Sequence, residues 1–214
     1  HVGTLERWNV SMFQRANVQP ANVEQSMAAD KPQTVHVPDL AVEKLQRKFP
    51  HVPFAVHRFR DEVTVYVPRE RLVEVCRFLR DDAELRFNFL SDLTALDWWG
   101  RTPRFEVVYH LYSLVHFQRL RLKVRVEEDD CWVPTVTEVW STANWHEREV
   151  WDMFGIRFEG HPDLRRILTP EQVLDERTGE WKPFEGHPLR KDFDLDYEPP
   201  EFTQRKIARH YAKE

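Results

Sequence analysis

The side chains best suited to chemistry are concentrated in one segment, which reads Asn144-Trp-His-Glu-Arg-Glu-Val-Trp-Asp-Met-Phe-Gly155. His146 followed by Glu147 matches the first half of a zinc-protease helix. That motif needs a second histidine four residues after the first, and a valine stands there. The acidic residues could form a catalytic pair, yet the segment contains no serine, cysteine or lysine nucleophile. Large aromatic side chains beside charged ones favour a partner interface instead.

The same segment has the signals of a short helix. Asn144 can cap the first turn, and Glu147, three residues later, completes a capping box. Gly155 suits the position just after a helix, where a left-handed residue ends the last turn. We therefore predict a helix over 144–155.

Gly-His-Pro occurs twice after this helix, first in a run that ends at Arg165 and again in a run that ends at Arg190. His161 and His187 could be two ligands of one metal ion, but no third ligand stands at a recognisable spacing. Proline restricts the residue before it to extended conformations. We interpret the repeats as two turns that orient the arginines.

Composition excludes several classes of protein. The 214 residues are 41% hydrophobic and 31% charged, with a net charge of −5 that argues against a dedicated nucleic-acid binder. Two cysteines, Cys76 and Cys131, are too few for a four-cysteine iron–sulfur or zinc site, and they favour a reducing compartment. The six glycines are scattered, so no glycine-rich dinucleotide loop is present. No apolar run reaches the ~20 residues that span a bilayer.

Hydrophobic periodicity predicts the elements that would position these residues. A helix starts near Pro38, two short strands follow, and a second helix starts after Pro68. The apolar stripe of the second helix consists of Leu72, Val75, Cys76 and Leu79. We therefore interpret Cys76 as a small core residue.

Two alternating segments predict a β-hairpin with its loop at 113–118. The register that keeps apolar residues on one face sets Phe105 opposite Val126 and Glu106 opposite Arg125. The outward face of the last strand would carry Arg119, Arg121, Lys123 and Arg125. This face could be an ordinary solvated surface or a basic docking stripe. The expected fold is α+β, a mostly antiparallel sheet with helices on one face.

Three regions follow from these patterns. Residues 1–34 form a polar N-terminal extension, and 35–160 form the α+β domain, including the short helix. Residues 161–214 hold six of the 14 prolines and little periodicity, so we expect an extended arm that lies on a partner.

Three ordered motifs resemble a known family. They are the run Glu147-Arg-Glu-Val-Trp-Asp-Met-Phe-Gly155, then His161-Pro-Asp-Leu-Arg-Arg-Ile-Leu168, then Glu185-Gly-His-Pro-Leu-Arg-Lys-Asp-Phe193. Together they resemble the 30-kilodalton subunit of respiratory complex I, which is also called the C subunit or iron–sulfur protein 3. Arg104–Tyr109 and Leu120–Val124 extend the resemblance, which covers about residues 36–193.

The resemblance implies a subunit in the hydrophilic arm of the proton-pumping NADH:quinone oxidoreductase. Such a subunit binds the larger quinone-site (49-kilodalton type) subunit and other subunits of the arm. Flavin, iron–sulfur clusters and quinone belong to those partners, and this chain would carry none and catalyse nothing alone. We expect the partner interface to use Glu147, Arg148, Trp151, Asp152, Phe154, His161, Arg165, Arg166, His187 and Arg190.

The resemblance also implies a peripheral position on an inner membrane. The absence of an initial methionine and the long polar N-terminus favour the mitochondrial matrix face, with the bacterial cytoplasmic face as the other possibility. Residues 171–184 and 194–214 depart from the compact family pattern. The path of the arm there is not predicted by the resemblance.

Three alternatives stay open on the sequence. One is the equivalent subunit of a membrane-bound hydrogenase or of another quinone reductase. A second is an RNA-binding α/β module that uses the basic strand, although such modules need exposed aromatic residues on the sheet. A third is a free-standing metalloenzyme.

Overall fold

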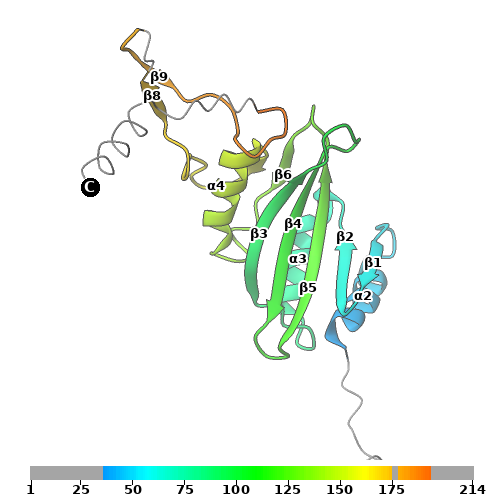
Figure 1. Ribbon diagram of the computed structural model, residues 1–214. Helices are drawn as coiled ribbons and strands as arrows, with labels where there is room; N and C mark the ends of the chain where they lie inside the picture. Colours follow the sequence, from blue (N-terminus) through cyan, green and yellow to red (C-terminus); the bar gives the residue numbers. More distant parts are fainter. Residues whose placement is uncertain (1–35, 175–177, 194–214) are drawn as a thin grey trace, which may run out of the picture. The chain divides into compact units, whose positions relative to one another are not determined.

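A computed structural model describes residues 36–174 and 178–193 (Figure 1). The predicted N-terminal extension and the end of the arm lie outside these residues. The described part has three α-helices, a short 3-10 helix and nine strands. In chain order they are α2 (Val37–Lys48), β1 (Ala55–Phe59), β2 (Glu62–Tyr66), η1 (Arg69–Arg71), α3 (Leu72–Asp81), β3 (Phe89–Asp97), β4 (Phe105–Ser113), β5 (Gln118–Val126), β6 (Trp132–Pro134), α4 (Ala143–Phe154), β7 (Arg157–Glu159), β8 (Gln172–Leu174) and β9 (Trp181–Pro183).

Five strands form the main sheet, in the order β1-β2-β5-β4-β3. The β4–β5 hairpin has the predicted register, with Phe105 opposite Val126 and Glu106 opposite Arg125. Apolar and polar side chains alternate along these strands because one face of the sheet is buried. A shift of the pairing register by one residue would expose the whole apolar set. β2 pairs with β5 in parallel, and the other pairs in this sheet are antiparallel. The α+β prediction with a mostly antiparallel sheet is therefore confirmed.

The core lies between the inner sheet face and the helices. Figure 1 shows α3 behind the sheet and α2 beside β1 and β2. The predicted stripe of α3 is fully buried, and Cys76 is a core residue as expected. α4 adds Val150, Met153 and Phe154 to the same hydrophobic cluster. Burial of this kind contributes roughly 25 cal/mol for each Å² of apolar surface, so α4 is fixed to the domain by its own apolar face.

Two small sheets were not predicted. β6 and β7 form a parallel pair that brackets α4 in the chain, joining Trp132 to Arg157 and Pro134 to Glu159. β8 and β9 form an antiparallel hairpin within the 171–184 insertion. The arm was expected to lack elements of its own, and this hairpin corrects that expectation. Within the described ranges, no helix is both long and apolar enough to cross a membrane.

Candidate partner-binding surface

Helix α4 forms where the sequence predicted, with one difference at its start. The helix begins at Ala143, and its N-cap residue Thr142 makes no side-chain capping hydrogen bond. The predicted capping box is therefore wrong, because the Glu147 carboxylate binds another segment of the chain. The C-terminal prediction is confirmed, because Gly155 has a φ of 77° and its N–H donates to the Trp151 carbonyl.

Glu147 lies in the interior of the domain. Its Oε1 accepts a 2.7 Å hydrogen bond from the Val136 N–H, and its Oε2 accepts one of 2.5 Å from the Thr135 hydroxyl. Burial raises the pKa of Glu147 to about 7, although both hydrogen bonds oppose the rise. A carboxyl group in this position fastens α4 to the segment after β6. Its side chain does not reach the solvent.

Two further side chains of α4, Arg148 and Asp152, bind the backbone of the arm. Arg148 donates 3.1 Å hydrogen bonds to the carbonyls of Arg165 and Arg166. Oδ2 of Asp152 accepts from three consecutive N–H groups, those of residues 167, 168 and 169, at 2.8–3.1 Å. A cation and an anion spaced four residues apart thus hold successive carbonyl and amide groups of the segment 165–169, which bends at residues 167–169. We call this arrangement the backbone clamp.

The clamp keeps Asp152 ionised. Burial by itself would raise the pKa of Asp152, but the Thr169 hydroxyl and the three backbone N–H groups lower it to about 2. Arg166 adds an ion pair, with Nη1 at 2.8 Å from Oδ1. The Asp152 side chain is 0% exposed, so all of these interactions are made within the chain.

The first Gly-His-Pro turn docks on the start of α4. Nδ1 of His161 accepts a 3.0 Å hydrogen bond from the Asp163 N–H, so that nitrogen carries no proton. Nε2 then donates to the Asn144 carbonyl at 3.2 Å. This bond occupies a carbonyl of the first helical turn. The first Gly-His-Pro turn therefore fixes the direction in which the arm leaves β7.

The second Gly-His-Pro turn docks on the end of α4. Nδ1 of His187 donates to the Asp152 carbonyl at 2.9 Å, and the ring meets Trp151 edge to face with centroids 6.5 Å apart. A methyl group on Gly155 would stand 2.6 Å from Cδ2 of His187. Glycine is needed there both for its left-handed φ and for the space that the imidazole fills.

Arg166 joins the two turns to each other. Besides its ion pair with Asp152, Nη2 donates to the carbonyls of Phe184 at 3.1 Å and Gly186 at 3.2 Å. Its guanidinium also lies 5.7 Å from the Trp151 ring centroid. The repeated motif therefore forms two turns that bind the two ends of one helix, whereas the sequence predicted only turns that orient Arg165 and Arg190.

A third anchor holds the end of the described arm against the main sheet. Arg104 is buried and pairs with Asp97 at 2.8 Å, with Asp192 at 2.6 Å and with Glu128. Trp99 covers the guanidinium at 4.3 Å from the ring centroid. A second arginine, Arg190, pairs with two of these carboxylates. The sequence motif contained Arg104, but nothing in its spacing pointed to partners in distant segments of the chain.

The predicted interface residues divide into two groups. Glu147, Arg148, Asp152 and Phe154 are buried, and the first three have partners inside the chain. Trp151, Arg166, His187 and Arg190 are half-buried, the His161 side chain is fully buried, and all five hold the arm in place. Arg165 differs, because its side chain is 65% exposed, against 15% for Arg166 and 24% for Arg190. Contact with another subunit was predicted for all ten, and it stays a prediction.

Exposed apolar residues mark a surface that the sequence reasoning missed. Trp181 is 67% exposed, and Trp145 on α4 and Leu168, Leu174 and Leu189 along the arm are exposed as well. Exposed aromatic side chains are enriched in protein interfaces. A Thr178-Gly179 turn between short apolar runs is a hairpin signal that could have revealed β8 and β9. We call this set, with Arg165, the arm surface.

Metal and thiol chemistry find no support in the geometry. His161 and His187 bind opposite ends of α4, and the described residues contain no group of three or more His, Cys, Asp or Glu placed to hold a metal ion. Both cysteines are free, and burial raises the pKa of the Cys131 thiol to about 11. A thiol with such a pKa is a poor nucleophile near neutral pH.

Comparison with known sequences gives one consistent result. Residues 65–199 match the family described as "Respiratory-chain NADH dehydrogenase, 30 Kd subunit". The C subunit of the NADH-quinone oxidoreductase of Roseiflexus sp. (strain RS-1) is 50% identical over 81% of this chain and 95% of its own length. The corresponding C subunit of Geobacter sulfurreducens is 49% identical over 74% of this chain and 93% of its own length.

Two solved structures share the fold. A chain described as Nqo5 of a trypsin-resistant fragment is 38% identical, with a TM-score of 0.51, over 60% of this chain and 99% of that chain. A chain from an archaeal membrane-bound sulfane sulfur reductase, a respiratory membrane complex, is 25% identical, with a TM-score of 0.55. It covers 79% of this chain and 91% of that chain.

Proposed function

Because the chain belongs to the 30-kilodalton subunit family of NADH-quinone oxidoreductase, whose bacterial members are C subunits of that enzyme, we propose a specific role for it within the complex. It acts as a rigid support that carries no redox group and holds the quinone-site subunit through its arm surface. Electron transfer from NADH to quinone, and the proton pumping coupled to it, take place on the partners.

The backbone clamp is the observation that carries this proposal. Helix α4 uses its charged side chains to fix an extended segment, which then presents Arg165 and apolar side chains outward. A segment that is already ordered loses less conformational entropy when a partner binds. The arm therefore behaves as a preformed docking strip, which suits a subunit whose task is to hold a neighbour.

The organisms of the relatives also bear on which membrane carries the complex. The C subunits of Roseiflexus and Geobacter are bacterial proteins, so they give no support to the expected mitochondrial matrix face. We propose instead a peripheral position on the cytoplasmic side of a bacterial membrane, reached through the complex.

A second assignment draws on the sulfane sulfur reductase. Its chain shares the fold across most of this sequence, which supports the equivalent subunit of a related membrane complex as an alternative. Identity of about half with the bacterial C subunits, over nearly their full length, favours the NADH-quinone enzyme.

Charge reversal at Arg165 tests the docking role. Arg165→Glu should lower the amount of assembled complex at least about tenfold, because a like charge facing a desolvated partner carboxylate costs several kcal/mol. Native gels of solubilised membranes with NADH:quinone activity staining measure this loss. Wild-type assembly of the variant would rule out Arg165 as an anchor.

The matched control is Arg157→Glu. Arg157 is also exposed, but it lies on β7 and outside the arm surface. We expect normal assembly for this variant. The purified full chain should keep its wild-type Tm in both variants, so a defect found with Arg165→Glu alone reports docking and not folding.

A further inference from the structure

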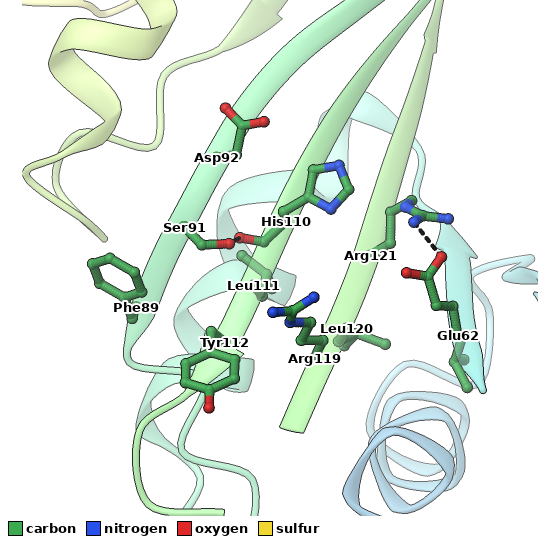
Figure 2. A pocket seen from close by; sticks show the side chains of 11 residues that line it. Glu62, Phe89, Ser91, Asp92, His110, Leu111, Tyr112, Arg119, Leu120 and Arg121 are labelled. Atoms are coloured by element: carbon green, nitrogen blue, oxygen red, sulfur yellow. Dashed lines mark hydrogen bonds and ion pairs between the residues drawn. The ribbon is translucent and has the colours of Figure 1, made fainter. Parts of the chain in front are cut away.

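The outer face of the main sheet carries a groove that the arm does not use. It crosses strands β2, β5, β4 and β3, and its volume is about 460 Å³. Figure 2 shows its polar and aromatic side chains in two rows across the strands. One row is Asp92, His110 and Arg121, and the other is Phe89, Tyr112 and Arg119. Neighbours in such rows have Cβ atoms about 5 Å apart, so each row acts as one contact surface.

Charges on this face are nearly balanced within the chain. Glu62 pairs with Arg121, and Glu106 lies 2.9 Å from Lys123 and 3.6 Å from Arg125. Burial lowers the pKa of His110, and Arg121 lowers it further, so the imidazole adds no positive charge near neutral pH. Of the four cations on this strand face, one has no partner in these pairings.

That cation is Arg119. It is exposed, and it has no hydrogen bond or ion pair with any residue in the described part of the chain. Its cross-strand neighbour is Tyr112, whose own neighbour is Phe89, with 39% of its surface exposed. An exposed arginine in the same cross-strand row as two aromatic side chains is the type of residue that anchors protein interfaces.

The loop next to this row is apolar and exposed. Leu114, Val115 and Phe117 follow Tyr112 in the β4–β5 turn, and each exposes more than half of its surface. Phe117 has a positive φ of 55°, a conformation that costs a non-glycine residue energy. The turn therefore holds a bulky ring in solvent, in the loop that joins the strand ends carrying Tyr112 and Arg119.

We propose that this groove and the β4–β5 loop bind a second subunit of the oxidoreductase, through a segment that places one carboxylate on Arg119 and apolar side chains on Phe117 and the ring of Tyr112. One unpaired guanidinium matches one carboxylate, in a bidentate pair. A nucleic acid is disfavoured, because its binding requires several unpaired cations along a phosphate backbone. The inference rests on membership of the complex and does not depend on the arm surface.

The test places a benzophenone amino acid at position 117 in the full chain and irradiates the intact purified complex. Mass spectrometry should identify a crosslink to a peptide of another subunit that contains Asp or Glu near the attachment point. Crosslinks confined to this chain, crosslinks to RNA, or no crosslink at all would each overturn the proposal.

Two neutralising variants identify the cation. Arg119→Gln should lower the crosslink yield at least about tenfold. Arg125→Gln, on the same exposed strand face but paired with Glu106 and stacked on Tyr66 at 4.5 Å, should leave the yield unchanged. Equal yields from both variants would show that Arg119 is not the anchor. Failure of the docking role at Arg165 would leave this result unaffected, since position 117 lies outside the arm.

Discussion

Two carboxylates on one helix have opposite acid–base behaviour. Glu147 accepts two hydrogen bonds in a buried site, and burial raises its pKa to about 7. Asp152 accepts three backbone N–H groups, a hydroxyl and a guanidinium, and its pKa falls to about 2. Both are equally buried. The number of donors around each carboxylate therefore decides which one stays charged.

Replacement of Glu147 by glutamine should change how stability depends on pH. The folded chain keeps a proton on Glu147 up to about pH 7, whereas the unfolded chain releases it near pH 4.5. The folded state therefore binds more protons between these values, and its stability falls as pH rises through that range. A pKa difference of this size corresponds to roughly 3 kcal/mol. Glu147→Gln should remove most of this contribution, since the amide oxygen can accept from the Val136 N–H while the amide NH2 donates to the Thr135 hydroxyl.

Urea unfolding of the full chain and of the variant at pH 5 and pH 8 measures this effect. The free energy of unfolding should drop less in the variant between the two pH values. An identical drop in both proteins would mean that Glu147 is ionised in the folded chain at both pH values. Its burial would then not make the free energy of unfolding depend on pH. Glu149→Gln, on an exposed position of the same helix, is the matched control.

At the scale of elements, helix α4 binds the arm at both of its ends. The first Gly-His-Pro turn binds its start and the second binds its end. Gly155 is the point where the helix and the second turn meet, since the His187 ring occupies the space that a side chain would fill. Adding a single methyl group at Gly155 should therefore weaken the contact between the arm and α4 strongly.

Gly155→Ala should destabilise the chain by roughly 3 kcal/mol, the sum of left-handed strain and displacement of the imidazole. Gly179→Ala isolates the first part, because Gly179 also has a positive φ of 72° but nothing lies within 4 Å of its missing methyl. It should cost about 1 kcal/mol. Thermal unfolding of both variants gives the comparison. Equal losses would mean that His187 moves aside freely.

Local periodicity predicted the elements whose pattern repeats within a few residues. The register of β4 and β5 followed from alternation, and the stripe around Cys76 followed from helical spacing. Both depend on one buried face, and such a face is visible in any amphipathic segment. The strands β6 and β7 are three residues each and pair in parallel across α4, so their short runs left no period to detect.

The candidate site was predicted as a set of residues but not as an arrangement. The sequence identified Asp152, His161 and His187 without showing that the carboxylate binds backbone N–H groups or that the histidines bind backbone carbonyls. Backbone partners have no sequence signature. The Arg104 cluster was missed for a different reason, since its carboxylates come from three separate segments.

At the scale of the whole described chain, the arm is fixed to the domain at four places. These are the backbone clamp, the two histidine turns and the buried Arg104 cluster. Most charged groups of the predicted interface are used in this way, and Arg165, which pairs with Asp163 and is 65% exposed, faces outward with the apolar arm surface. These contacts fix the arm on the domain, so that it presents an ordered surface, as a subunit that binds a neighbour requires.

Lysine crosslinking of the intact complex, followed by mass spectrometry, tests this account most directly. Lys191 is an exposed residue of the arm, next to the Arg104 cluster, and Lys48 is exposed at the end of α2. We predict that Lys191 crosslinks to the quinone-site subunit and that Lys48 does not. Crosslinks from Lys48 but none from Lys191 to that subunit would contradict the claim that the arm holds it.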